Sequence, residues 1–223
     1  MKIDDTFKFD RLSLANINEE TDFIPLVSSE SDYQLEEGEH PEEIALLPLR
    51  NTVIFPGVVA PITAGRDKSI KLINDAQNGT KLIGVIAQKD GKTEAPGFED
   101  LHTVGTLAKI IRMFKMPDGN TTVIIQGLNR FTIKEPIQSD PYLRAKIEVI
   151  KEQSDAEKTK DFEILIGSVK DLASQIIQDS PTIPSEAQFA LNNIKSNTFM
   201  VNFISSNMNV DVNGKQELLE EDD

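Results

Sequence analysis

The chain has 223 residues, a formal net charge of −14 and no cysteine. The lack of cysteine excludes disulfides, thiolate-bound metal and a cysteine nucleophile, and it fits a reducing cytosol. No run of 18 apolar residues occurs, so the sequence predicts no membrane-spanning helix and no membrane partner. The amino terminus also lacks the apolar core of a secretory signal, and we expect a cytoplasmic protein.

The negative charge is concentrated at the two ends of the chain. Residues 1–43 hold 13 acidic and 3 basic residues, and residues 217–223 hold 5 acidic residues and no basic one. Residues 44–216 hold 19 acidic and 20 basic residues and are nearly neutral. Because phosphate contacts need a basic surface, nucleic acid is not expected as a partner. Residues 1–43 show no sustained hydrophobic period and are interpreted as an acidic, disordered leader that aids solubility.

Residues 44–151 are predicted to form a β domain with one inserted helix. Asp67 to Ala76 has apolar residues at helical spacing and ends at Asn78-Gly79, a pair that tolerates positive φ. Pro117-Asp118-Gly119 is a strong hairpin signal, and Gly127 and Asn129 are interpreted as turn residues. Short turns between the runs favour a largely antiparallel sheet, which could close into a small barrel. Six or seven strands are expected, at 44–49, 58–62, 81–88, 107–115, 121–126, 130–134 and 143–151.

The hydrophobic period changes near residue 155, and residues 155–210 are predicted to form a small helical bundle. A second helix should begin at Ser185, with Gln188 completing a capping box, and a third should run from about Thr198 to Asn207 with Phe199, Met200, Phe203 and Ile204 inward. The clearest amphipathic stripe precedes both helices and is expected to be core. It consists of Phe162, Leu165, Ile166, Val169, Leu172, Ala173, Ile176 and Ile177.

Residues 211–223 are interpreted as the start of a truncated helix, with Asn213 and Gln216 as its cap pattern. A helix of two turns is marginal in isolation. The abrupt acidic end favours a fragment of a longer protein, although a natural short protein gives the same pattern.

The sequence offers no reacting group in a catalytic arrangement. It has no G-x-x-x-x-G-K-S/T loop, so no P-loop nucleotide site is predicted. Its two histidines, His40 and His102, lie in unrelated contexts and are interpreted as surface residues rather than metal ligands. Ser168 and Lys170 are two residues apart on a predicted helix and point to different faces. We therefore predict no catalytic residue, no metal and no bound cofactor.

Exposed apolar residues are the remaining candidates for function. The first group is Met113, Phe114 and Met116 beside the predicted hairpin turn, because methionine adapts to varied apolar partners. The alternative is that alternate residues pack inward as strand positions. The second group is Phe55 and Pro56, for which a core position is the stronger alternative. Arg50 is expected to hold a loop through hydrogen bonds rather than to contact a ligand.

Four segments resemble the N-terminal domain of the Lon family of ATP-dependent proteases. The first is LPLRNTVIFPG, from Leu47 to Gly57. Three more follow in the order that this family shows: VGTLAKI from Val104, GLNRF from Gly127 and PYLRAKI from Pro141. The resemblance covers nearly all of residues 44–220 and leaves the leader outside. It implies an α+β fold, with a PUA-like antiparallel β pseudo-barrel at 44–151 followed by the helical bundle.

The resemblance also implies a function. The module would bind unfolded or misfolded proteins through exposed apolar surface and would help a homohexamer assemble. ATP, Mg²⁺ and the Ser-Lys serine protease dyad of this family would belong to domains absent from the sequence, so the fragment itself is not expected to be an enzyme. Three alternatives stay open: a purely structural oligomerisation domain, an RNA-binding PUA-like domain, and a stand-alone regulatory protein. Charge argues against the RNA alternative, and fold alone does not decide function.

Overall fold

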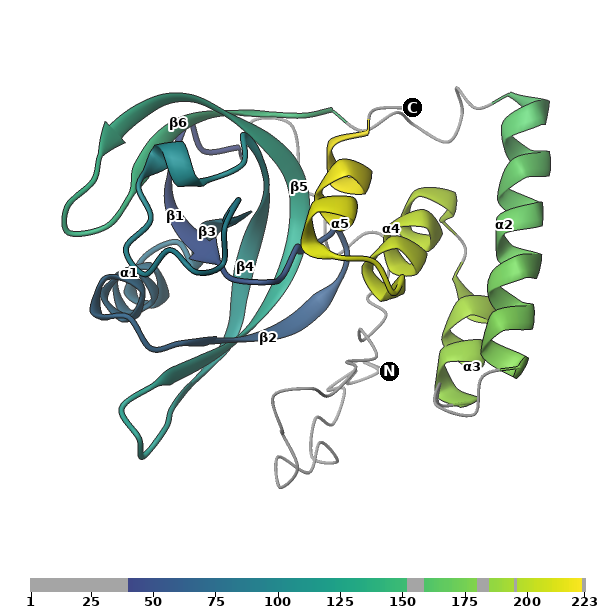
Figure 1. The fold of residues 1–223 in the computed structure, drawn as a ribbon, viewed down its shortest axis with the longest axis horizontal. Coiled ribbons are helices and arrows are strands. Elements are labelled where there is room, and N and C mark those ends of the chain that lie inside the picture. Colours follow the sequence, from purple (N-terminus) through teal and green to yellow (C-terminus); the bar gives the residue numbers. More distant parts are fainter. Residues whose placement is uncertain (1–39, 152–158, 180–184, 195, 222–223) are drawn as a thin grey trace, which may run out of the picture.

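The computed structural model describes residues 40–151, 159–179, 185–194 and 196–221. The predicted leader therefore lies almost wholly outside the described residues, as does the predicted boundary near residue 155. The strands and α1 form one body, and helices α2 to α5 lie along one side of it (Figure 1). This is the α+β architecture expected from the sequence.

The six strands form one sheet that closes on itself. Its order is β2-β5-β4-β3-β1-β6, and an additional pairing of β5 with β6 closes the barrel. All pairings are antiparallel except that of β1 with β3, so the predicted antiparallel character is confirmed. The strands are β1 Glu43–Leu49, β2 Val59–Ala64, β3 Leu82–Ala87, β4 Val104–Lys115, β5 Thr121–Gln138 and β6 Arg144–Val149.

One long strand replaces two predicted short ones. The prediction placed strands at 121–126 and 130–134 with turn residues between them, but β5 is continuous from Thr121 to Gln138. Its register with β4 shifts between Thr106 and Ala108, where a bulge absorbs the irregularity. Gly127 is required for a different reason: a Cβ there would lie 2.3 Å from the backbone oxygen of Phe55. This glycine therefore marks a close backbone approach rather than a turn.

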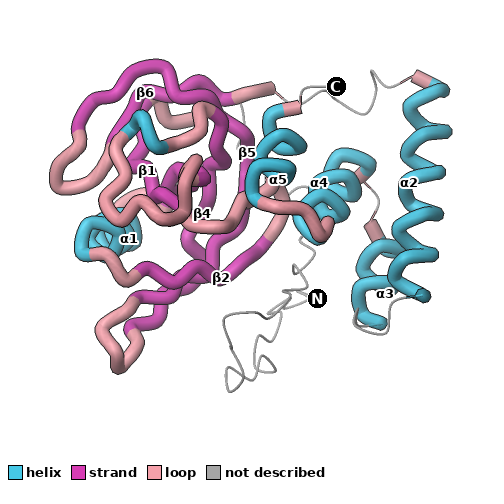
Figure 2. Tube along the Cα trace, viewed as in Figure 1, coloured by secondary structure: helices cyan, strands magenta, loops and turns pink. Residues whose placement is uncertain are grey.

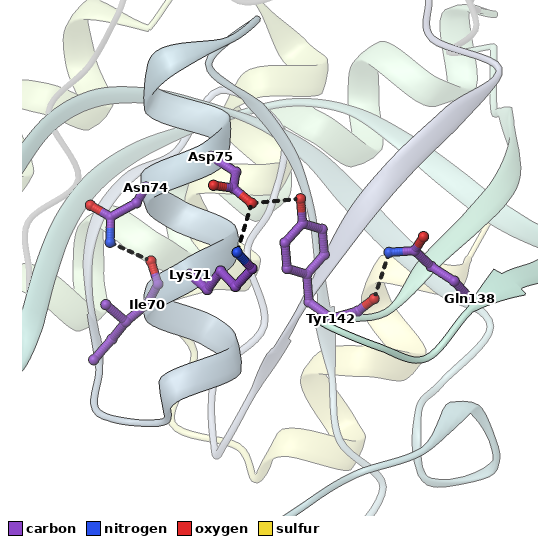
Figure 3. Close-up of polar contacts among 6 residues, drawn as sticks. All are labelled: Ile70, Lys71, Asn74, Asp75, Gln138 and Tyr142. Atoms are coloured by element: carbon purple, nitrogen blue, oxygen red, sulfur yellow. Dashed lines mark hydrogen bonds and ion pairs between the residues drawn. The ribbon is translucent and has the colours of Figure 1, made fainter.

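Helix α1, Asp67–Asn78, is confirmed where the sequence predicted it. Leu72 and Ile73 are buried against strand residues of the barrel, and each such side chain contributes about 1.5–3 kcal/mol when removed from water. The exposed side of α1 is tied to the loop before β6, because the Tyr142 hydroxyl donates to Asp75 Oδ2 over 3.1 Å (Figure 3). Lys71 lies 4.0 Å from the same carboxylate. The PYLRAKI segment thus helps to position α1.

The carboxyl-terminal helices share a core with the barrel. They are α2 Lys160–Asp179, α3 Ser185–Asn193, α4 Asn197–Asn207 and α5 Val212–Glu220. Ser196 begins α4 by accepting a hydrogen bond from the backbone N–H of Phe199 at 3.0 Å. Phe199, Met200 and Phe203 are buried as predicted, and they belong to the same core as Leu46 and Phe131 of the barrel.

Helix α5 is anchored by the barrel rather than marginal. Its cap is Asp211, which accepts from Gly214 N at 2.8 Å, so the predicted Asn213 cap is wrong. Leu219 packs beneath the barrel's Phe55 loop. Arg130 of the GLNRF segment donates to the carbonyl oxygens of Leu219 at 2.9 Å and Glu221 at 2.7 Å. These non-local contacts supply the stability that a two-turn helix lacks alone.

Helix α2 departs most from the sequence prediction. Of the eight stripe residues expected in the core, only Ile166 is buried, whereas Phe162, Ala173 and Ile177 are partly covered. The other four stripe residues are exposed. Figure 2 shows the reason: α2 lies at the outer edge of the helical group, with α4 and α5 between it and the strands. Only one edge of its apolar stripe therefore reaches the core.

Candidate functional site

The β4–β5 hairpin presents the first predicted contact group. Met116 is 44% exposed, whereas Met113 and Phe114 are only partly exposed. Met113 packs against the barrel core, as the strand alternative predicted. The turn is fixed by a hydrogen bond of 2.9 Å from Met116 N to Asn120 O and by Gly119 at φ +90°. The hairpin projects from the barrel (Figure 1). Met116 is more exposed than Ile111, the other exposed large apolar side chain of β4 and the turn.

The second predicted contact group is not on the surface. Phe55 is 1% exposed, and Pro56 is also buried. The physical reason is the following glycine: Gly57 has φ +79°, and a Cβ there would lie 2.3 Å from the Phe199 ring. This loop is therefore covered by α4 and α5. Phe55 and Pro56 hold the barrel and the helices together, and their interpretation as a contact surface is corrected.

The largest exposed apolar side chains lie on α2 and α3. Leu165, Leu172, Ile176 and Phe189 are between 58% and 73% exposed, and Val169 completes the stripe on α2. We call these five side chains the α2–α3 face: four form one stripe on α2, and Phe189 lies on the neighbouring α3. A hydrogen bond of 3.1 Å from Gln188 Nε2 to Ser174 Oγ joins the two helices. Groups of exposed apolar residues are uncommon on monomers and mark contact sites.

The sequence predicted that the four α2 members of the α2–α3 face, Leu165, Val169, Leu172 and Ile176, belong to the core, and it did not point to Phe189. Helical spacing reveals an apolar face without revealing what covers it. The number of apolar residues in the stripe was the available sign of an exposed face. Eight of them on a 20-residue helix are more than two short neighbouring helices can cover.

A polar pocket lies between β1, β2 and the start of α1. It has a volume of about 390 Å³, and its lining includes Arg50, Arg66 and Ser69. Arg66 Nη2 donates to Gln88 Oε1 at 2.8 Å and to the Thr93 carbonyl at 3.3 Å. Burial lowers the pKa of Arg66 and the charge of Arg50 lowers it further, against the effect of Glu94. No motif or spacing in the sequence points to Arg66.

The remaining titratable and nucleophilic candidates have structural surroundings. His102 is partly buried rather than on the surface, with Nδ1 3.8 Å from Glu220 Oε1. Burial lowers the pKa of His102, while Glu220 acts in the opposite direction. The Ser168 hydroxyl donates to the Ile164 carbonyl of its own helix at 3.0 Å.

The described parts of the chain hold neither a metal-ligand cluster nor a membrane-spanning helix. No group of three His, Cys, Asp or Glu side chains in these parts of the chain is arranged to hold a metal ion. No described helix combines the length and the apolar character needed to cross a bilayer.

A barrel with a helical extension that displays apolar side chains defines a binding module. The chain belongs to the family described as the ATP-dependent protease La (LON) substrate-binding domain, whose model matches residues 43–223. It is 51% identical over 210 residues to a Lon protease of Flavobacterium johnsoniae, with 94% of this chain and 26% of that protein covered. It is 47% identical over 205 residues to a Lon protease of Cytophaga hutchinsonii, with 92% and 25% covered. The chain therefore spans about a quarter of the length of these relatives.

Solved structures show the same fold at low sequence identity. The N-terminal domain of the Mycobacterium avium complex Lon protease matches with a TM-score of 0.59 at 18% identity, covering 80% of this chain and 96% of that one. The Lon N-terminal domain protein of Xanthomonas campestris matches with a TM-score of 0.55 at 19% identity, covering 81% and 91%.

Proposed function

We propose that this chain captures unfolded or misfolded proteins for a Lon-type protease by binding their apolar segments on the α2–α3 face. The observation that carries the proposal is the exposure of Leu165, Leu172, Ile176 and Phe189 on two helices that are themselves ordered against the core. An unfolded chain exposes the apolar side chains that a folded protein buries. The α2–α3 face can therefore distinguish the two states without reading a sequence.

Binding at one copy should be weak. Covering one large apolar side chain contributes about 1.5–3 kcal/mol, and association and ordering of the partner offset much of the sum. Several copies in one assembly would gain affinity through effective concentration. We propose that the parent is a homohexamer, and that ATP hydrolysis with Mg²⁺ and Ser-Lys proteolysis belong to the part of the relatives that this chain does not span.

Self-association is the second candidate use of the same surface. Leu165, Val169, Leu172 and Ile176 follow the spacing i, i+4, i+7, i+11, which is the spacing of a helix-pairing seam. A purely structural oligomerisation domain would place a second copy on the α2–α3 face. The two functions differ in whether an unfolded protein competes for the face.

The test compares matched polar substitutions. Leu172→Gln combined with Ile176→Gln changes the α2–α3 face, and Leu218→Gln is the control because Leu218 is also exposed but lies on α5. Affinity for a fluorescently labelled unfolded polypeptide is measured while light scattering reports the mass of the protein. Substrate capture predicts that only the double variant loses affinity. Equal affinity of the wild type and both variants would refute it, and a mass that falls only in the double variant would favour self-association.

A further inference from the structure

The pocket between β1 and β2 lies where two strand edges have no strand beside them. Among the described strands β2 pairs only with β5. β1 pairs with β3 over Leu46–Leu49 but with β6 only over Glu43–Ala45. Pro48 and Pro61 line the pocket from these two edges. Because proline has no backbone N–H to donate, the two edges are poor templates for an added strand, and a ligand must be held mainly by side chains.

Two guanidinium groups meet at this pocket without a carboxylate partner in hydrogen-bonding contact. Arg66 is positioned by Gln88, a buried side chain that also donates to the carbonyl oxygens of Asp90 and Thr93 at 3.3 Å and 3.0 Å. Arg50 makes no hydrogen bond or ion pair within the described part of the chain. The expectation that Arg50 holds a loop by hydrogen bonds is therefore wrong. Glu94 acts on Arg66 through its charge but makes no hydrogen bond or ion pair with it, and two adjacent cations attract a negatively charged ligand.

Ser69 supplies a third, independent observation. It is 7% exposed and lines the pocket. Its hydroxyl makes no hydrogen bond to another described residue, and it is not one of the fully buried unpaired polar atoms, so it is accessible from the pocket and free to donate to a ligand. Ser69 lies in the first turn of α1, whose N-cap Arg66 makes no side-chain cap hydrogen bond. The free backbone N–H groups of that turn add positive potential, against the exposed carboxylate of Asp67.

We propose that this pocket binds a carboxylate of a peptide, with Arg50 and Arg66 as the charged contacts and Ser69 as a hydroxyl donor. The planar guanidinium fork matches a carboxylate, and Leu49 and Ile62 in the lining offer apolar contact to an adjoining side chain. A volume of about 390 Å³ suits one or a few residues of a peptide rather than a whole domain. The inference rests on the proposed function only in taking the ligand to be part of a protein substrate.

The experiment uses three short fluorescent peptides that differ only in charge. One carries Asp and an amidated end, the second carries Asn and an amidated end, and the third carries Asn and a free carboxyl end. Fluorescence anisotropy gives their Kd for the full chain. We expect an Asp side chain or a free carboxyl end to bind about tenfold more tightly than the neutral peptide, and the comparison of the two identifies the source of the carboxylate.

Two variants and one control assign the effect to the pocket. Arg50→Gln should abolish the preference for the charged peptides, and Ser69→Ala should reduce it. Lys109→Gln removes the same charge at an exposed strand position outside the pocket and should leave the preference intact. Equal binding of all three peptides, or equal losses in Arg50→Gln and Lys109→Gln, would overturn the proposal. Competition by inorganic phosphate without any binding of the charged peptides would overturn the assignment to a carboxylate.

Failure of the pocket proposal can be distinguished from failure of the proposal that the α2–α3 face binds unfolded protein. The double variant Leu172→Gln, Ile176→Gln should keep the preference for the charged short peptides while losing the unfolded polypeptide. Arg50→Gln should show the opposite pattern.

Discussion

Arg130 is the side chain through which the GLNRF segment holds α5, and its removal gives the most informative test of the fold. Its guanidinium donates to the carbonyl oxygens of Leu219 and Glu221, which close the end of α5. Arg130→Met keeps most of the buried stem and removes both hydrogen bonds. Hydrogen bonds from a charged donor contribute about 1.5–3 kcal/mol each, but water can reach the exposed Glu221 end. We therefore expect a net loss of about 2–4 kcal/mol in the free energy of unfolding.

The loss should be local before it is global. Gln216 Nε2 still donates to the Val104 carbonyl at 2.9 Å and Leu219 still packs on the barrel, so α5 should fray rather than detach. Urea unfolding measures the free energy, and hydrogen exchange of residues 212–220 reports the fraying. Lys109→Met, at an exposed position, should change stability by less than about 0.5 kcal/mol. Unchanged exchange in α5, together with a loss no larger than that of the control, would refute the anchoring role of Arg130.

Three further predictions follow from the geometry. Gly57→Ala should lower the free energy of unfolding by about 2–5 kcal/mol, because it adds a clash with Phe199 to a left-handed backbone. Gly119→Ala should lower it by only about 1–2 kcal/mol, because the added Cβ meets open space and only the φ of +90° is unfavourable. Equal losses of the two variants in thermal denaturation would contradict the packing argument. Because burial lowers the pKa of His102, the unfolded state takes up its proton first, so stability should fall as pH drops below the ordinary pKa of about 6.5, and His102→Asn should weaken this dependence in urea titrations at pH 5 to 7. Met116→Ser should leave stability within about 0.5 kcal/mol of wild type and weaken binding of the unfolded polypeptide; unchanged affinity would remove the hairpin tip from the binding surface.

The sequence predicted those helices and turns whose positions depend on residues close together in the chain. The α1 helix ends at Asn78 as predicted, although Gly79 has φ −109° rather than the positive φ that the sequence suggested, and Pro117-Asp118-Gly119 forms the predicted hairpin. Burial of Phe199, Met200 and Phe203 followed from helical spacing. For α1 and the hairpin the deciding residues lie within one turn of the chain, whereas burial of Phe199, Met200 and Phe203 also requires the barrel residues that cover them.

Non-local contacts explain what the sequence could not reveal. A glycine at position 127 is compatible with a turn and also with a strand that another backbone segment approaches closely. Only the tertiary structure, which places the Phe55 backbone beside Gly127, shows that the second explanation applies. The stripe on α2 predicts an apolar face, but its cover depends on where α3 and α4 end. The pocket joins Arg50 and Arg66 through the geometry of β1 and α1, which no spacing in the sequence encodes.

The most direct test of substrate capture locates the bound protein on the surface. An unfolded polypeptide carrying photoreactive groups is bound to the chain, irradiated and digested, and the crosslinked peptides are identified by mass spectrometry. The account predicts that crosslinks concentrate within residues 160–193, on the side of α2 that carries Leu172 and Ile176, with fewer on the hairpin. Crosslinks spread evenly over the barrel, or none on α2 while the polypeptide is bound, would contradict it.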